Sequence, residues 1–303
     1  TQNFMESEIS KTRGWKNILQ IIIPYFLVVG TCQLIGAYIV GLNPQNYMTA
    51  TTRQLFVILF FNVTGTLLVI WFFRKYIDKK PFASLGFPKS FFKKDISIGL
   101  IAGFSIILSG FVSLLLSNQI EFVNIHLYLS DFILSVGLFI FVAISEEIFL
   151  RGYILGNLTE SFNKHIALII SAIIFSVMHA FNPHFNLISM LALFMSGLLF
   201  GLPYIYTKSL WFPIALHFSW NFFQGTIFGF NVSGRDTYSL ITTKENFANI
   251  WNGGSFGFEA SILSIWFQLL ALLIVFLIFK NRIRSKTFSP KNPSDNRISD
   301  SGS

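Results

Sequence analysis

Cysteine and charge are both scarce in this sequence. The single cysteine, Cys32, cannot form an intramolecular disulfide, and its apolar neighbours in LVVGTCQLIGA argue against redox chemistry. Charged residues make up 12% of the chain, whereas soluble domains have about 25%. With 53% hydrophobic residues, 37 phenylalanines and a mean hydropathy of +0.61, the sequence predicts a polytopic membrane protein without a soluble domain of useful size.

Eight apolar windows reach the length of ~20 residues that a helix needs to cross a hydrocarbon core of ~30 Å. They lie at residues 18–42, 54–73, 97–117, 132–157, 166–182, 186–207, 210–230 and 259–280. We therefore predict an all-α fold with about eight transmembrane helices. The first apolar run is longer than the roughly 7–15 residues of a signal-peptide core, so we expect it to remain in the lipid bilayer as an anchor.

Lysine and arginine gather in alternate connections between these windows. Eighteen of the 22 lie in the N-terminal segment, the second, fourth and sixth connections and the C-terminal segment. Because basic residues concentrate on the cytoplasmic side, we expect both termini in the cytoplasm. The net charge of +8 then reflects orientation and attraction to anionic headgroups, and no nucleic-acid partner is expected. We divide the chain into a cytoplasmic segment 1–17, a membrane domain 18–284 and a disordered tail 285–303.

Three ionisable side chains lie inside the fourth window, in the sequence SEEIFLRG. A charged residue near the centre of a spanning helix costs roughly 2.5–3.5 kcal/mol, which indicates a function unless the residues only reach the interface. Glu147 and Arg151 are four residues apart and about 40° apart around a helix, so they can form an ion pair. Glu146 lies about 140° from Arg151 and keeps a free carboxylate.

Two further windows contain buried polar groups. His179 ends the run IISAIIFSVMHA, and His217 and Asn221 share a helical face in WFPIALHFSWNFF. A lone histidine on an apolar helix is usually a packing residue. These side chains would satisfy one another if they met Glu146, so we expect them to converge on a polar cavity inside the bundle.

Such a group can support hydrolysis. A carboxylate takes a proton from water, imidazoles hold the water or polarise a carbonyl, and an asparagine amide donates to a developing oxyanion. Glu146, His179 and His217 are also a set of zinc-ligand types, although they are spread over three helices. A divalent metal such as zinc therefore stays open as a cofactor.

The three motifs resemble those of a known family. EEIFLR has the form E-E-x-x-x-R, FSVMH has the form F-x-x-x-H, and HFSWN has the form H-x-x-x-N. In this order, over about residues 130–230, they are similar to the type II CAAX prenyl endopeptidases, also called the CPBP or Abi intramembrane proteases, which are common in bacteria. The resemblance implies a multi-pass protein in the cell membrane of a bacterium that cleaves a peptide or protein entering from the lipid bilayer.

The resemblance also implies roles for single residues. Glu146 matches the glutamate that activates water, and His179 and His217 match the histidines around it. Asn221 matches the asparagine of the oxyanion region. The supporting positions of the motifs are Glu147, Arg151 and Phe175. The predicted helix ends place Glu146 and His179 at different depths in the membrane, so either tilted or unequal spans absorb the difference or one boundary is wrong. The family's site opens toward the cytoplasm, which favours a shifted boundary.

Two alternatives remain. A non-proteolytic protein of the same fold, such as a bacteriocin-immunity factor or a scaffold, would keep the motifs for binding. A transporter would also have buried polar groups, but the spans show no inverted repeat and no paired broken helices. The remaining histidines, His126, His165 and His184, lie at span margins or in a loop, where a polar side chain needs no special explanation.

Overall fold

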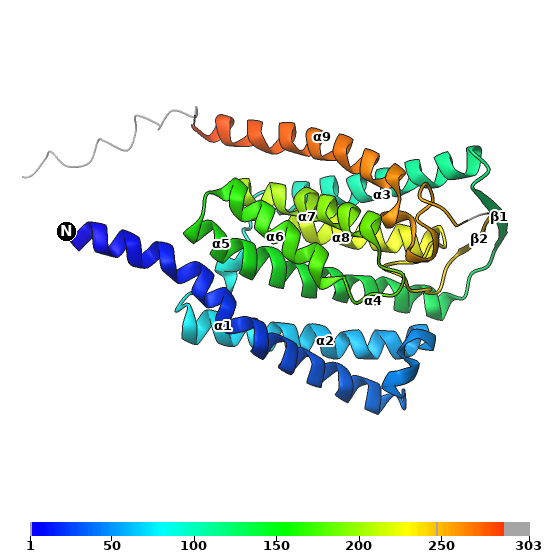
Figure 1. Cartoon of the computed structure of the whole chain (residues 1–303), viewed down its shortest axis with the longest axis horizontal. Helices are drawn as coiled ribbons and strands as arrows, with labels where there is room; N and C mark the ends of the chain where they lie inside the picture. Colours follow the sequence, from blue (N-terminus) through cyan, green and yellow to red (C-terminus); the bar gives the residue numbers. More distant parts are fainter. Residues whose placement is uncertain (1, 247, 288–303) are drawn as a thin grey trace, which may run out of the picture.

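The computed structural model describes residues 2–246 and 248–287. Its helices run roughly along one long axis (Figure 1). The α-helices are α1 Gln2–Ile39, α2 Thr52–Phe72, α3 Phe92–Leu116, α4 Leu129–Glu147, α5 Gly156–Ser161, α6 Lys164–Met178, α7 Leu187–Thr207, α8 Trp211–Asn221 and α9 Ile262–Thr287. Three π-helical segments are η2 Phe73–Ile77, η4 Ile148–Leu155 and η5 Phe222–Ile227, and the 3₁₀ turns are η1 Pro44–Thr49, η3 Phe82–Leu85, η6 Gly254–Phe256 and η7 Phe258–Ala260.

All eight expected apolar segments are helical and occur in the expected order. Among the described residues, six of the helices are long and apolar enough to cross a membrane. The fifth segment is α6, which has only 15 residues, and the seventh is α8, which has 11 before η5 begins. The chain is therefore a mostly helical, multi-pass membrane protein with two of its eight segments shorter than predicted. Residues 285–287, predicted as the start of the disordered tail, belong to α9. From residue 288 onward the predicted tail lies outside the described residues and stays a prediction.

The fourth span is longer than predicted, and its true length removes the mismatch in membrane depth between Glu146 and His179. Helices α4, η4 and α5 form one continuous rod from Leu129 to Ser161. Glu146 is fifteen residues before the end of this rod at Ser161, and His179 is fifteen residues after the start of α6 at Lys164. At ~1.5 Å per residue both are about 22 Å from the same end of the bundle. The predicted boundary at residue 157 was four residues short.

Side-chain caps define where two of the helices begin. The Thr51 hydroxyl accepts a hydrogen bond from the backbone N–H of Gln54, and the Gln54 side-chain Oε1 accepts one from the backbone N–H of Thr51. Helix α2 starts at the residue after Thr51. Asn186 and Ser189 form the same reciprocal pair at the start of α7. Such caps satisfy backbone N–H groups that a helix leaves unpaired in its first turn.

The connections at one end of the bundle contain a small sheet, which the all-α prediction missed. Strand β1 (Ile120–Ile125) pairs antiparallel with β2 (Ile241–Glu245), with an irregular register between Phe122 and Asn124. Both sequences, IEFVNI and ITTKE, contain β-branched residues, which favour strands. Strands of six and five residues in polar connections are too short for a strong alternating pattern. We call this end of the molecule the sheet end (Figure 1).

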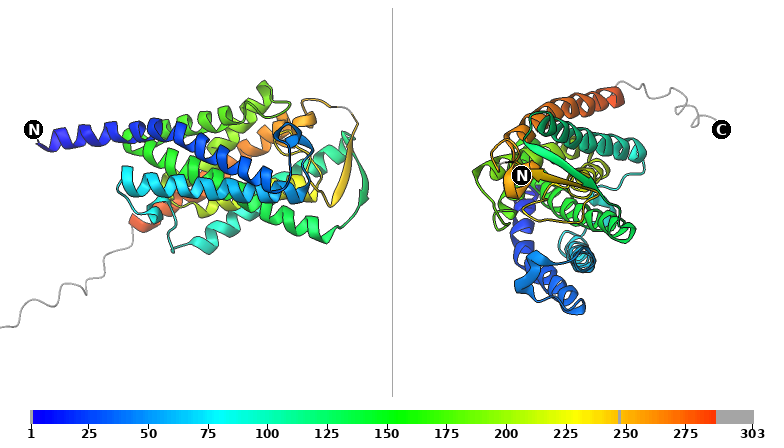
Figure 2. Two further views of the ribbon diagram at one scale, coloured as in Figure 1. Left: turned by 90° about the horizontal axis from the view of Figure 1, so that it is seen from below. Right: turned by 90° about the vertical axis from the view of Figure 1, so that its right-hand side faces the viewer.

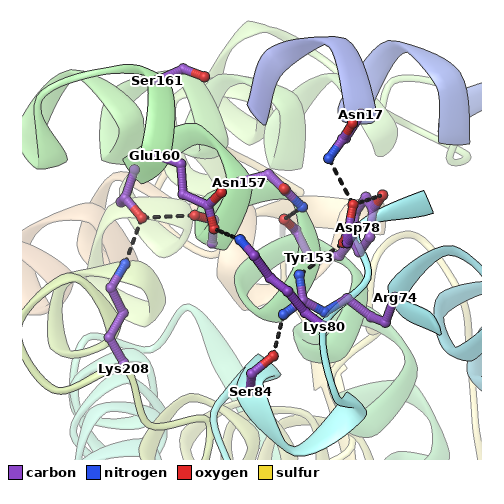
Figure 3. A network of polar contacts seen from close by, with 12 residues as sticks. Asn17, Arg74, Asp78, Lys80, Ser84, Tyr153, Asn157, Glu160, Ser161 and Lys208 are labelled. Atoms are coloured by element: carbon purple, nitrogen blue, oxygen red, sulfur yellow. Dashed lines mark hydrogen bonds and ion pairs between the residues drawn. The ribbon is translucent and has the colours of Figure 1, made fainter. Parts of the chain in front are cut away.

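A buried polar network ties the helices together at the opposite end (Figure 3). Asp78, which follows η2, accepts hydrogen bonds from Asn17 of α1 at 2.7 Å and from Arg74 at 2.8 Å. The Tyr153 hydroxyl of η4 lies 3.4 Å from the same carboxylate, and Arg74 also contacts Ser84. Because these groups are buried together, each satisfies polar atoms of the others. The network joins α1, η2 and η4 at this end of the bundle.

The helices are arranged as a central group with a pair on one side. In the end view of Figure 2, α1 and α2 lie together beside the remaining helices. Helix α2 packs against α4, and α9 packs against α7 and α3 on the other side. The outward faces of α1 and α9 carry exposed apolar side chains such as Ile23, Leu27, Leu270 and Leu273. Such faces suit contact with lipid.

Candidate active site

The two adjacent glutamates of α4 occupy different environments. The Glu146 side chain is 29% exposed and lines a cavity of about 370 Å³ inside the helix bundle. Glu147 is completely buried and lies outside the lining of that cavity. The π-helical segment η4 begins at the next residue, Ile148. A π-helical turn is rare and is frequently found at functional sites.

Glu147 lies at the centre of a buried charged group below the cavity. Its Oε1 accepts a hydrogen bond from Arg151 Nη1 at 2.8 Å, which is the ion pair expected from the spacing. The same oxygen lies 2.8 Å from His217 Nδ1, a contact that the sequence did not predict. The Arg151 guanidinium is held between the rings of Phe175 and Phe200, at 4.5 and 5.3 Å from their centroids. A buried arginine in this position is neutralised by the carboxylate and stabilised by the two aromatic faces.

His179 faces Glu146 across the cavity. It caps the C-terminus of α6, and its Nδ1 lies 2.8 Å from the carbonyl oxygen of Phe175. Because a carbonyl only accepts, Nδ1 carries the proton, and in the neutral ring Nε2 is the acceptor. His179 Nε2 lies 3.9 Å from Glu146 Oε2. One water molecule can span such a separation and hydrogen-bond to both atoms.

Helix α8 places His217 and Asn221 on the same wall of the cavity. Both residues are buried and line it, and Asn221 is the last residue of α8 before the π-helical segment η5. The SEEIFLRG and HFSWN motifs therefore both meet a π-helical segment, one after Glu147 and the other after Asn221. His217 packs beside Phe200, with ring centroids 5.1 Å apart.

The cavity gathers five of the seven residues singled out from the sequence. Glu146, Phe175, His179, His217 and Asn221 line it, whereas Glu147 and Arg151 lie beneath them. Phe175 contacts the rings of both histidines, at 4.7 and 6.4 Å between centroids. The arrangement brings a partly exposed carboxylate, two imidazoles and an amide to one space, and these groups can act as a general base and as oxyanion donors.

Sequence reasoning missed a second carboxylate in this cavity. Glu259, in the turn before α9, is buried and lines the cavity. Its Oε1 accepts hydrogen bonds from the backbone N–H of Ser233 at 2.6 Å and from the Ser233 hydroxyl at 2.8 Å. Arg235 and Tyr47 also line the cavity, with the Arg235 guanidinium 4.0 Å from the Tyr47 ring centroid. The available signal was a glutamate at the first position of the predicted apolar window 259–280.

The proposed metal ligands do not form a recognisable metal centre in the described part of the chain. Among those residues, no group of three histidine, cysteine or acidic side chains is placed to hold a metal ion. As placed in the structure, His179, His217 and Glu146 are therefore not grouped as the three ligands of a metal ion, and no step of the mechanism passes through one.

The other three histidines lie away from the cavity. His184 lies in the turn between α6 and α7 with a φ of 61°, and the exposed His165 is in the first turn of α6. His126 lines a separate pocket of about 490 Å³ at the sheet end, together with Tyr238 and Glu245. Burial raises the pKa of the Glu245 carboxyl above its ordinary value.

Comparisons with known proteins cover the middle of the chain. Residues 128–223 match the family model described as Type II CAAX prenyl endopeptidase Rce1-like. A stretch of 98 residues, 31% of this chain, is 37% identical to a protein of Bacillus subtilis (strain 168) named "Putative membrane peptidase YdiL". The aligned stretch spans 38% of that relative's length. No solved structure gave a significant match to the chain.

Proposed function

Because residues 128–223 carry the signature of the Rce1-like type II CAAX prenyl endopeptidases, we propose that this chain is an intramembrane endopeptidase. Glu146 activates the water molecule that attacks the peptide bond. The observation that carries the proposal is the pairing of Glu146 with His179 at 3.9 Å, inside a cavity that also contains His217 and Asn221. A carboxylate and an imidazole at this separation can hold one water between them.

Attack begins with that water. It donates one hydrogen bond to Glu146 Oε2 and the other to Nε2 of His179, which is an acceptor because Nδ1 donates to the Phe175 carbonyl. This arrangement leaves a lone pair of the water oxygen free to attack the carbonyl carbon of the peptide. As the carbon–oxygen bond forms, the proton passes to Glu146. General-base assistance of this kind contributes about 10²–10⁴-fold in rate.

The wall formed by α8 stabilises the oxyanion. The Asn221 amide donates to the negatively charged oxygen, and His217 donates from Nε2 in its protonated form. Glu147 stabilises that imidazolium because its carboxylate lies 2.8 Å from His217 Nδ1. Protonated Glu146 then gives its proton to the leaving nitrogen, the carbon–nitrogen bond breaks, and the product carboxylic acid releases its proton to solvent. Each prearranged oxyanion donor is worth about 10²–10³ in rate.

Replacement of the proposed base tests the mechanism. Purified Glu146→Gln protein and the unmodified chain are compared in detergent, with internally quenched peptides that carry a hydrophobic segment. The matched control is Glu160→Gln, which changes an exposed glutamate near the end of the same rod, where it pairs with Lys80. We expect Glu146→Gln to abolish cleavage and Glu160→Gln to retain it. Retained cleavage by Glu146→Gln would refute the proteolytic mechanism.

The same variant separates catalysis from binding. If the protein acts as an immunity factor or scaffold, Glu146→Gln keeps that biological activity, because the amide nearly preserves the shape of the side chain. Loss of both cleavage and biological activity in Glu146→Gln, with Glu160→Gln unaffected, supports the enzyme.

A further inference from the structure

The basic residues and the mouth of the cavity lie at opposite ends of the bundle. Helices α2, α5, α7 and α9 end, and α1, α3, α6 and α8 begin, at the end opposite the sheet, which we call the basic end (Figure 1). Lys291 and Arg297 fall outside the described residues. The remaining lysines and arginines divide into sixteen in the segments of the basic end, Arg151 beneath the cavity, and three at the sheet end: Arg53, Arg235 and Lys244.

The cavity is open toward the sheet end. Apart from His179, which caps α6, the lining residues from connecting segments are Tyr47 of η1, Asn182 between α6 and α7, Val232, Ser233, Arg235 and Thr237 between η5 and β2, and Glu259 of η7. All of these except Val232 and Glu259 are partly exposed. Among the described residues, none of the lining side chains comes from the connections of the basic end. The mouth is therefore built from connections of the sheet end.

Toward the basic end the cavity is closed by packed and polar layers. All eight residues of η4 are buried, and the Phe149 ring stacks on Tyr25 with centroids 3.6 Å apart. Below this layer lies the network of Asp78, Asn17 and Arg74 (Figure 3). A peptide that reached Glu146 from the basic end would have to break these contacts. Entry from the sheet end requires no such change.

Two sequence-based expectations are therefore incompatible in this fold. Cytoplasmic termini put the basic end in the cytoplasm, and then a cavity that opens at the sheet end cannot open toward the cytoplasm. The charge asymmetry decides between them, because the basic end has sixteen lysines and arginines and the sheet end has three. A basic residue near an anionic cytoplasmic surface contributes roughly 1 kcal/mol of attraction. A reversed orientation would place the sixteen basic residues of the basic end on the extracytoplasmic side of the membrane.

We propose that the catalytic cavity opens on the extracytoplasmic side and that its substrate is an exported or membrane-inserted polypeptide presented there. The wall formed by α1 and α2, with Phe26, Val29, Leu55 and Leu59, is apolar and fits a hydrophobic segment of that polypeptide. The statement that this polypeptide is cleaved rests on the proposed function. The statement that the cavity opens on the extracytoplasmic side does not depend on that function.

Cysteine labelling in intact bacterial cells tests the side of the opening. The background is Cys32→Ser, which removes the only thiol. Single cysteines then replace two exposed residues, Asp236 beside the mouth and Lys89 at the basic end. We expect a membrane-impermeant maleimide to label Asp236→Cys in intact cells and Lys89→Cys only after permeabilisation. The reverse pattern would overturn the proposal.

Adding a peptide to one known side of the membrane tests from which side the substrate is cleaved. A water-soluble quenched peptide with a short apolar segment is added to right-side-out and to inverted membrane vesicles, with Glu146→Gln vesicles as the blank. We expect cleavage in right-side-out vesicles and at least a tenfold lower rate in sealed inverted ones. Faster cleavage in inverted vesicles would overturn the inference. If neither orientation cleaves while Asp236→Cys is labelled from outside, the proposed protease function fails and the extracytoplasmic opening stands.

Discussion

His217 Nδ1 lies 2.8 Å from Glu147 Oε1, the oxygen that also accepts the hydrogen bond from Arg151. Because an ionised carboxylate only accepts, the proton is on His217 Nδ1, and Nε2 remains for the cavity. Glu147 thus orients a histidine of the site as well as neutralising an arginine. The Oε2 atom of its neighbour Glu146 lies 3.9 Å from His179 Nε2 and makes no hydrogen bond within the described part of the chain.

Glu147→Gln should destabilise the fold as well as the site. The substitution leaves the Arg151 guanidinium buried without its counter-charge, and breaking a buried pair in this way costs about 3–5 kcal/mol. We expect a clearly lower melting temperature in detergent, followed by light scattering or intrinsic fluorescence, together with loss of cleavage.

The double variant Glu147→Gln/Arg151→Met separates the two effects. It removes both charges, so most of the lost stability should return, while cleavage should stay low because His217 has lost its carboxylate partner. Full recovery of cleavage in the double variant would show that Glu147 acts only by neutralising Arg151.

His179→Ala should lower cleavage by about 10²–10⁴-fold with little change in stability, because the ring holds the water and is partly exposed to the cavity. Added imidazole should restore part of the activity by entering the space that the ring leaves. The control is His165→Ala, an exposed position in the first turn of the same helix. A fall of equal size in His165→Ala would indicate damage to α6 rather than loss of a water-holding group.

The sequence was sufficient to predict the membrane class, the order of the helical segments and the ion pair between Glu147 and Arg151. These features depend on apolar length and on spacing within one helix, both of which can be read locally. The contact between His217 and Glu147 joins residues seventy positions apart. No periodicity within a helix reports such a contact, because it depends on how α8 packs against α4.

The errors in the prediction have similar causes. The predicted fifth span ran through His179, whereas α6 ends at Met178, because an apolar sequence alone does not reveal where a buried helix stops. Glu259 was not singled out from the sequence, because its partner Ser233 lies in a distant connection. The strands β1 and β2 were missed because a short strand becomes stable only when its partner is beside it.

Asn221→Ala should lower kcat about 10²–10³-fold and leave KM nearly unchanged, because an oxyanion donor acts mainly in the transition state. Steady-state cleavage of a quenched peptide separates the two constants. Asn124→Ala, at an exposed position of β1, is the matched control and should leave both unchanged. A rise in KM with kcat preserved would assign Asn221 to substrate binding instead.

Glu259→Ala should loosen the mouth of the cavity. The backbone N–H and the hydroxyl of Ser233 both lose their acceptor, so amide hydrogen exchange at residues 231–235 should become faster. Glu259→Gln keeps an amide oxygen that can accept the same hydrogen bonds, and we expect it to protect this segment nearly as well. Equal exchange in Glu259→Ala and the unmodified chain would show that the mouth is held by other contacts.

Gly197→Ala should weaken the packing between α6 and α7. A Cβ at Gly197 would lie 2.7 Å from the Cα of Ala172, so the two backbones would have to move apart. Overpacking of this kind costs about 1–3 kcal/mol. The shift would also disturb the Gly197 carbonyl, which accepts from Arg151 Nη2 at 3.4 Å, so cleavage should fall together with the melting temperature.

Gly30→Ala is the control for stability, because a Cβ at this position in α1 meets no atom within 4 Å. It should be neutral or slightly stabilising, since alanine favours a helix over glycine by up to about 1 kcal/mol. A melting temperature of Gly197→Ala as high as that of Gly30→Ala would mean that α6 and α7 can separate at no cost. The position of His179 at the end of α6 would then not depend on this close approach.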